Sequence, residues 1–383
     1  MSGWTSSPVI KTVSRASQRS REIADARAMT RASASSSSRG SSKLPVFRLP
    51  KLDASEAEHR SFARNLVRTC HEIGFFYLCD HGVELSAEGV LAASKEFFAR
   101  SLEKKLGISY LNSPSFRGYM NLGCENTAGR TDRREQIEFG VEGLYDRDAA
   151  VFYDRLIGPN QFPSESTLRE EVNEFQRRMD ALSRRVMSYI ALGLGLEQDY
   201  FESTFGDAPN VQMKICRYPP TGSSDEFGVG EHSDTGYLSL LVQDNEVGGL
   251  QVKVNDMWID APPIAGSLVV NLGEMIQLCT RGYLLATPHR VRNTDTSRSR
   301  YSIPYFWNPR LDYSVKLIDL PDELVWRRPS ETERNFRATD SHEGRNQVYE
   351  CYGANAFKSY ARSHPKVMEA HHSDLNLEDL FSS

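Results

Sequence analysis

Beyond Gly206 the chain consists of short β-prone segments separated by turn signals, and this pattern strongly limits the folds open to it. Apolar and polar residues alternate over 250–254, as in a half-buried strand, and Asn255-Asp256 marks a turn directly afterwards. Similar segments lie at 211–218, 237–243, 257–259, 267–271, 287–291 and 300–306. Many short strands at this spacing predict a sandwich or a jelly roll.

Helical patterns dominate the amino-terminal half. Ser55 and Glu58 form a capping-box pattern, and apolar residues then repeat at helical spacing as far as Ile73. Gly74 is expected to end this helix before a buried strand at 75–78.

Two further helical segments are expected at 86–105 and 172–190, the second with one core-facing apolar stripe. We expect mostly loop over 110–165 and helix or mixed structure over 343–368. The predicted fold class is therefore α+β, mainly β, with a jelly-roll core flanked by amino-terminal helices.

Composition and charge narrow the function classes. The 383 residues are 39% hydrophobic and 25% charged, as in ordinary soluble proteins, and no apolar run is long enough to span a membrane. Residues 1–43 carry 8 basic and 2 acidic residues, hence +6, whereas the remainder carries 38 and 49, hence −11. An acidic body lacks the basic face that nucleic acid requires. We therefore expect no nucleic acid and no membrane, and a small-molecule partner instead. A monomer is the default expectation, because nothing in the sequence indicates an oligomer.

The tail at 1–43 contains 13 serines and no apolar segment of the secretory type. It is interpreted as a disordered tail or, alternatively, as an organelle transit peptide. The expected location is accordingly the cytoplasm, with a plastid or mitochondrion as the alternative.

Three ionisable residues of the β region could bind a metal. His232 and Asp234 lie two residues apart, so on an extended segment both point to one face, and His289 follows later. Two imidazoles and a carboxylate can occupy one face of a non-haem iron and leave the other positions open. A zinc hydrolase with the same triad is an alternative. Other histidines, among them His364 and the pair His371-His372, have no spaced partner, and the pair is expected to be solvated.

Arg300 and Ser302 also lie two residues apart on a predicted strand. A guanidinium fork binds a carboxylate in bidentate geometry, and a hydroxyl adds a hydrogen bond. An arginine that points into an apolar β core needs an anionic partner, which is either a ligand or a buried Asp or Glu. The zinc-hydrolase alternative leaves this pair unexplained.

Taken in order, these motifs resemble the Fe(II)- and 2-oxoglutarate-dependent oxygenase superfamily, in particular its isopenicillin N synthase-like branch. The resemblance covers roughly 44–365. It includes Leu44-Pro45-Val46-Phe47, Gly74-Phe75-Phe76-Tyr77, His81-Gly82-Val83, Arg217-Tyr218-Pro219-Pro220, Gly248-Gly249-Leu250-Gln251-Val252, Asn271-Leu272-Gly273-Glu274 and Thr287-Pro288-His289-Arg290-Val291.

The resemblance implies a double-stranded β-helix over 206–310, preceded by a helical and loop region at 44–205. The segment 311–383 would complete the pocket. His232, Asp234 and His289 would be the iron ligands and thereby the catalytic residues. Arg300, Ser302 and Tyr218 would bind 2-oxoglutarate. Dioxygen would be the oxidant, with ascorbate as a candidate reductant.

The implied reaction oxidises an unactivated C–H bond of a small polar or carboxylate-bearing metabolite in specialised metabolism, with release of succinate and CO2. Hydroxylation, desaturation and oxidative cyclisation all remain open. Alternatives are an ethylene-forming type, a 2-oxoglutarate-independent oxidase, and an inactive small-molecule-binding homologue.

The segment around Glu125 resembles part of the microbial ethylene-forming enzyme, in which the matching Glu and Thr help to hold an amino acid. Glu125 and Thr127 are therefore substrate-site candidates. Arg362 is a third candidate, because Tyr352-Gly353 followed nine residues later by Arg362 resembles the carboxy-terminal pattern of the same enzyme. The chain departs from that enzyme at Lys214, which replaces an arginine, and at Thr235, which replaces an aromatic residue. These departures weigh against arginine as the substrate.

Overall fold

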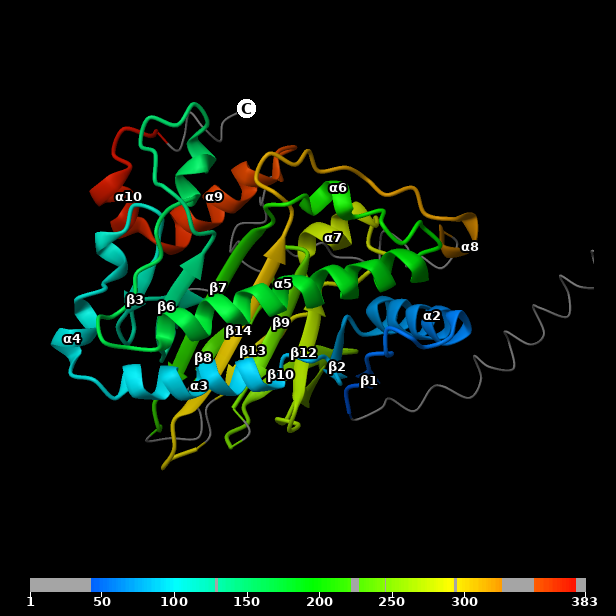
Figure 1. Ribbon diagram of the computed structural model, residues 1–383, viewed down its shortest axis with the longest axis horizontal. Helices are drawn as coiled ribbons and strands as arrows, with labels where there is room; N and C mark the ends of the chain where they lie inside the picture. Colours follow the sequence, from blue (N-terminus) through cyan, green and yellow to red (C-terminus); the bar gives the residue numbers. More distant parts are fainter. Residues whose placement is uncertain are drawn as a thin grey trace, which may run out of the picture. The chain divides into compact units, whose positions relative to one another are not determined.

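Two facing β-sheets form the centre of the computed structural model, which describes residues 43–127, 130–221, 227–244, 246–292, 295–325 and 348–376 (Figure 1). The eight-stranded sheet has the order β1 (Val46–Arg48), β2 (Phe75–Cys79), β12 (Ser267–Leu272), β9 (Leu238–Gln243), β14 (Arg300–Asn308), β7 (Asn210–Tyr218), β6 (Glu135–Gly140) and β3 (Gly118–Met120). The four-stranded sheet has the order β11 (Met257–Asp260), β10 (Leu250–Val254), β13 (His289–Arg292) and β8 (Phe227–His232). A small hairpin pairs β4 (Asn126–Thr127) with β5 (Arg130–Thr131).

One apolar cluster lies between the two sheets. Its members include Tyr77, Tyr218 and Val269 from the large sheet and Val229, Val252 and Val291 from the small one. Side chains from both inner faces therefore pack against each other, as they do in a double-stranded β-helix. The predicted α+β fold with a jelly-roll core is confirmed.

Helices cover the outer face of the large sheet, where α5 crosses in front of the strands in Figure 1. The described part of the chain contains α2 (Glu56–Glu72), α3 (Glu84–Phe98), α4 (Leu102–Leu106), α5 (Leu168–Gly193), α6 (Glu202–Phe205), α7 (Glu274–Cys279), α8 (Asp322–Val325), α9 (Tyr352–Ser363) and α10 (Pro365–His371), with short 3₁₀ turns at Tyr110–Asn112 and Phe152–Leu156. The predicted apolar stripe of α5 is buried, and α5 contacts α2, α3 and β14. In the described part of the chain, none of these helices has the length and apolar character of a membrane span.

The end of α2 is joined to the segment that leads into β13. Gly74 ends α2 with a φ of 72°, and a Cβ atom there would collide with the carbonyl oxygen of Leu285. The Leu285 N–H donates to the carbonyl of Cys70 over 3.0 Å, and the Thr287 hydroxyl donates to the carbonyl of Ile73 over 2.5 Å. These contacts form a seam between residues 70–75 and 283–289.

The region expected to be mostly loop at 110–165 contains β3 and β6, so the amino-terminal half supplies strands as well as helices to the large sheet. β6 lacks apolar alternation because Glu135, Gln136 and Glu138 are all buried in it. The two carboxylates are paired with cations from other elements, such as Lys214 on β7 for Glu138, and the Gln136 amide donates to Glu138. A strand of this kind cannot be predicted from the alternation of apolar and polar residues.

The expectation of a solvated His371-His372 pair is wrong for His372, which is 1% exposed. The chain after α10 folds back so that His372 Nε2 lies 2.7 Å from the carbonyl oxygen of Pro114. Its ring also stacks on Phe116. His372 is therefore buried between an aromatic ring and a backbone acceptor, although its place near the end of the sequence suggested that it was exposed.

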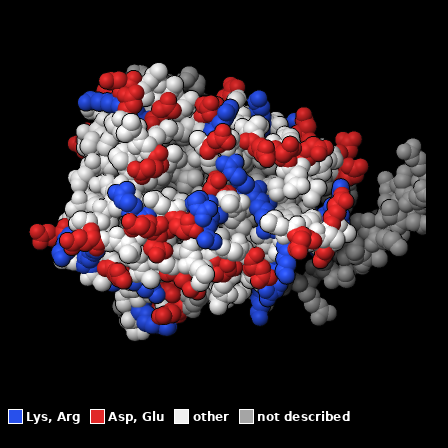
Figure 2. All heavy atoms as spheres, in the orientation of Figure 1, with Lys and Arg blue, Asp and Glu red and all other residues white. Residues whose placement is uncertain are grey.

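The face in Figure 2 carries acidic and basic side chains side by side. On α5, for example, Glu174 pairs with Arg177 and Arg178, and Asp180 pairs with Arg184. Among the described residues of this face, charge is therefore locally balanced and not gathered by sign.

Candidate metal centre and anion site

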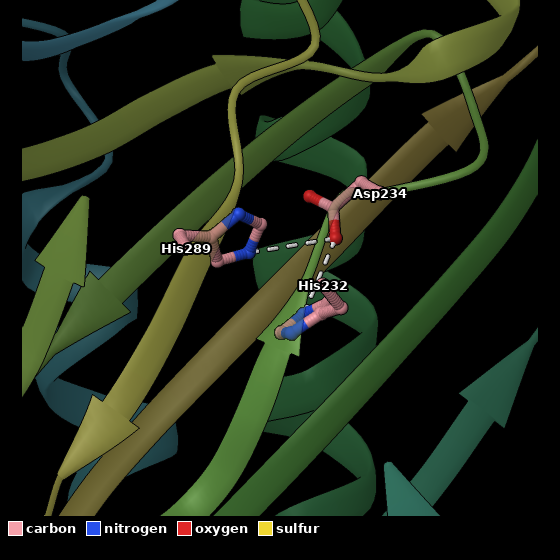
Figure 3. Close-up of side chains that lie close together, drawn as sticks. All are labelled: His232, Asp234 and His289. Carbon is pink, nitrogen blue, oxygen red and sulfur yellow. Dashed lines mark ion pairs between the residues drawn. The ribbon is translucent and has the colours of Figure 1, made fainter. Parts of the chain in front are cut away.

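The fold brings His232, Asp234 and His289 together where β8 and β13 meet (Figure 3). His232 ends β8, His289 begins β13, and the two residues stand opposite each other in the antiparallel register. One potential ligand atom from each of the three residues lies within 4.8 Å of the others. Asp234 Oδ1 is 3.8 Å from His232 Nε2 and 3.7 Å from His289 Nε2.

Backbone carbonyls fix which nitrogen of each imidazole carries the proton. His232 Nδ1 lies 2.9 Å from the Gly230 oxygen, and His289 Nδ1 lies 3.1 Å from the Thr287 oxygen. A carbonyl only accepts hydrogen bonds, so Nδ1 is the donor in both rings. The lone pair of each Nε2 is then free for a metal, as is usual for histidine ligands.

The Asp234 carboxylate is oriented in a similar way. Its Oδ2 accepts hydrogen bonds from the Ser239 hydroxyl at 2.6 Å and from the Asn271 amide at 2.8 Å. Oδ1 therefore remains for a metal. Burial raises the pKa of Asp234, but the two imidazoles and these hydrogen bonds outweigh it, so the pKa lies below its usual value.

Burial, reinforced by the neighbouring His232, lowers the pKa of His289 to about 4. The ring is accordingly neutral near pH 7, which is the form that binds metals. Two neutral imidazoles and one ionised carboxylate on a single face fit a divalent iron with open coordination positions.

Arg300 lies in the interior between the sheets and is 0% exposed. Its guanidinium donates to Ser302 Oγ and to Gln243 Oε1, each at 3.2 Å, and lies 4.9 Å from the centre of the Tyr218 ring. Among the described residues, no carboxylate forms an ion pair with it, and its Nε has no hydrogen-bond partner. The alternative of a buried Arg–Asp or Arg–Glu pair is therefore not what the structure shows, and the charge calls for an anionic ligand.

Strand β9 relates this anion site to the triad. Ser239 holds Asp234 and Gln243 holds Arg300, and both side chains lie on the same face of β9. Ser239 and Gln243 are four positions apart, which is about 13 Å of strand. This arrangement suits a short ligand with acidic groups at both ends, one for the metal and one for the guanidinium.

The three substrate-site candidates differ in their placement. Glu125 is buried and paired with Lys214 and Arg134. Thr127 lies in β4, but its side chain is outside the described part of the structure. Arg362 lies on α9 and is exposed, whereas His364, just beyond the helix, is buried 3.5 Å from Glu138.

Sequence reasoning assigned no role to Ser239, Gln243 and Asn271. The first two are the polar positions of the otherwise apolar β9 segment LSLLVQ, and a polar residue on the inner face of such a strand is a usable signal. Asn271 lies within a motif that was recognised without a role for its side chain.

Residues 209–309 match the family described as the 2OG-Fe(II) oxygenase superfamily, and residues 44–165 match the family described as non-haem dioxygenase in morphine synthesis N-terminal. The 2-oxoglutarate-dependent dioxygenase frbJ of Dothideomycetidae sp. (strain 11243) is 34% identical over 334 residues, covering 84% of this chain and 91% of the relative. The chain belongs to the 2OG-Fe(II) oxygenase superfamily.

Other relatives agree with this assignment. Homoarginine-6-hydroxylase 2-ODD-C23 of Glycine max is 34% identical, covering 67% of this chain and 80% of the relative. The crystal structure of a full-length Neurospora crassa protein in complex with alpha-KG aligns with a TM-score of 0.67 and 26% identity, covering 83% of this chain and 96% of the other. This oxygenase is therefore a 2-oxoglutarate-dependent dioxygenase, and its cofactors are Fe(II) and 2-oxoglutarate.

Proposed function

We propose that this dioxygenase oxidises an unactivated C–H bond of a small polar or carboxylate-bearing metabolite of specialised metabolism. His232, Asp234 and His289 hold the iron. Arg300 and Ser302, beside Tyr218, receive the distal carboxylate of 2-oxoglutarate. When bound, iron and 2-oxoglutarate supply an oxidative decarboxylation that releases succinate and CO2 and oxidises the substrate carbon.

The observation that carries this proposal is the buried and unpaired charge of Arg300. A guanidinium with only neutral partners in a dry interior is costly, and a dicarboxylate that also reaches the metal removes this cost. Ser302 and Gln243 hold the guanidinium in place before the ligand arrives. The apolar side chains between the sheets, including Val229 and Val291, exclude water from the same space.

The relatives support a small polar substrate. Homoarginine-6-hydroxylase is named for an amino acid, and the similar Neurospora crassa protein has been crystallised with thymine. Both compounds are small and rich in hydrogen-bonding groups.

The test is succinate release by anaerobically purified protein supplied with Fe(II) and 2-oxoglutarate before oxygen is admitted. A panel of amino acids and carboxylated metabolites is added compound by compound. We expect one compound class to stimulate succinate formation and to be recovered in oxidised form. No succinate under any condition, with iron bound in stoichiometric amount, would refute the proposal. His232→Ala is the control that removes a ligand.

A further inference from the structure

The backbone carbonyls that orient the two imidazoles are supported differently. The acceptor of His232 Nδ1 is the Gly230 oxygen, which lies within strand β8. The acceptor of His289 Nδ1 is the Thr287 oxygen at 3.1 Å, and Thr287 lies before β13, which begins only at His289. Because Thr287 is outside the strands, another contact must hold its carbonyl if the imidazole of His289 is to keep one orientation.

The Thr287 side chain makes such a contact. Its hydroxyl donates to the carbonyl oxygen of Ile73 over 2.5 Å, and the residue is only 7% exposed. Ile73 is the C-cap residue of α2, where the carbonyls have no donor within the helix. Its own N–H donates to the Thr69 carbonyl over 2.8 Å, so the acceptor of the hydroxyl is itself fixed to α2.

The glycine that follows Ile73 leaves room for this hydrogen bond. A Cβ atom on Gly74 would lie 2.5 Å from Thr287 Oγ1, which is closer than such atoms can approach. The φ of 72° at Gly74 also turns the chain away directly after the carbonyl that accepts the bond. The end of α2 is therefore shaped so that the hydroxyl can reach it.

Thr287 can pass this restraint on to its own carbonyl. Its β-branched side chain is stiff at χ1, so a fixed Oγ1 also restrains the backbone of the residue. The following Pro288 confines Thr287 to the extended region, and the Pro288 carbonyl accepts a hydrogen bond from the Lys253 N–H over 2.9 Å. The Thr287 carbonyl, which accepts from His289, is thus restrained from both sides.

We propose that Thr287 is a positioning residue for His289. Its hydroxyl, bound to the end of α2, holds the carbonyl that keeps His289 Nε2 facing Asp234 Oδ1. The end of α2 then supports the metal centre although it contributes no ligand. This inference rests on the proposed function, because it takes His289 as an iron ligand. The competing explanation is that the hydroxyl only satisfies the Ile73 carbonyl at the helix end.

The first arm of the test measures metal affinity. Thr287→Val removes the hydroxyl and keeps the β-branched shape, whereas Thr287→Ser keeps the hydroxyl. Fe(II) is titrated anaerobically into metal-free protein in a calorimeter. Relative to wild type, we expect binding about 10- to 100-fold weaker in Thr287→Val and changed by less than about threefold in Thr287→Ser.

Ser183→Ala is the matched control for lost stability. The Ser183 hydroxyl is also buried and donates to a backbone carbonyl, that of Met179 at 2.7 Å, but it lies on α5. Both Thr287→Val and Ser183→Ala should lower the urea midpoint of the metal-free protein, and only Thr287→Val should weaken Fe(II) binding. The inference is overturned if Thr287→Val binds Fe(II) like the wild type, if Thr287→Ser binds as weakly as Thr287→Val, or if Ser183→Ala weakens binding equally.

The second arm starts from the wild-type protein and does not depend on how well a variant folds. Hydrogen exchange of peptides covering 69–75 is followed by mass spectrometry without metal and with Zn(II), which is redox-inert. The N–H groups of Ile73 and Gly74 both donate to the Thr69 carbonyl, next to the acceptor of the Thr287 hydroxyl. Because coupling between sites is reciprocal, metal binding should slow the exchange of these two amides.

The same exchange experiment on Thr287→Val should show less slowing. Exchange at 69–75 that is unaffected by metal in the wild type would contradict the inference, as would slowing that persists undiminished in Thr287→Val. Wild-type protein that binds neither Fe(II) nor Zn(II) would instead refute the proposed function, and this inference with it.

Discussion

Replacement of Arg300 by methionine distinguishes a guanidinium that binds an anionic ligand from one that forms an internal ion pair with a buried Asp or Glu. The variant loses hydrogen bonds to Ser302 and Gln243, at about 1 kcal/mol each. It also removes a buried charge that has no carboxylate partner among the described residues, which relieves a desolvation cost of comparable or greater size. The free energy of unfolding of the ligand-free protein should therefore change by less than about 2 kcal/mol.

The affinity for 2-oxoglutarate should fall strongly in the same variant, although its stability changes little. Loss of one partner of a desolvated ion pair costs about 3–5 kcal/mol, which weakens binding by roughly two to four powers of ten. Urea unfolding of the ligand-free protein gives the first quantity. Calorimetric titration of 2-oxoglutarate into anaerobic Fe(II)-loaded protein gives the second. A variant that loses several kcal/mol of stability and binds 2-oxoglutarate normally would refute the reasoning, because Arg300 would then serve an internal ion pair.

Three further perturbations test the centre and its surroundings. Asp234→Asn should abolish iron-dependent turnover and the rise in Tm that Fe(II) gives the wild type. Unchanged turnover would refute the assignment of the three iron ligands. Ser239→Ala frees Asp234 Oδ2 from one donor and should weaken iron binding about 10- to 100-fold by titration, and unaltered affinity would show that this hydrogen bond does not orient the ligand. Glu125, with its pKa lowered from 4.5 to about 2, stabilises the fold above pH 4.5 and loses that contribution as the pH falls toward 2. In Glu125→Gln, the free energy of unfolding should lack this pH-dependent contribution, which is about 3 kcal/mol. Acid unfolding measures it, and a variant with the same pH profile as the wild type would count against a charged Glu125.

The metal triad could be predicted because its chemistry depends on residue type and spacing. His232 and Asp234 are two residues apart, and the predicted strands bring His289 to them. The strand that carries His232 was not predicted, since Gly228 and Gly230 interrupt the apolar pattern of β8. The ligands were therefore easier to recognise than the element that positions them.

The charged cluster beside the centre could not be predicted in this way. Glu138 looks like a loop residue in the sequence, because a buried carboxylate is tolerated only through partners that folding brings to it. Those partners, Lys214 and His364, come from β7 and from the end of α9. A single sequence gives no sign that these distant positions meet.

The seam between 70–75 and 283–289 has a consequence for the engineering of this family. The ring of Phe75 packs edge-on against His289, with 5.1 Å between ring centres, so a residue from the amino-terminal half touches an amino acid of the metal centre. Chimaeras that join the helical half of one relative to the β core of another cut across this contact. Such hybrids could fold and still hold the imidazole at the wrong angle, and matching residues 70–75 to the recipient's 283–289 segment is the way to avoid it.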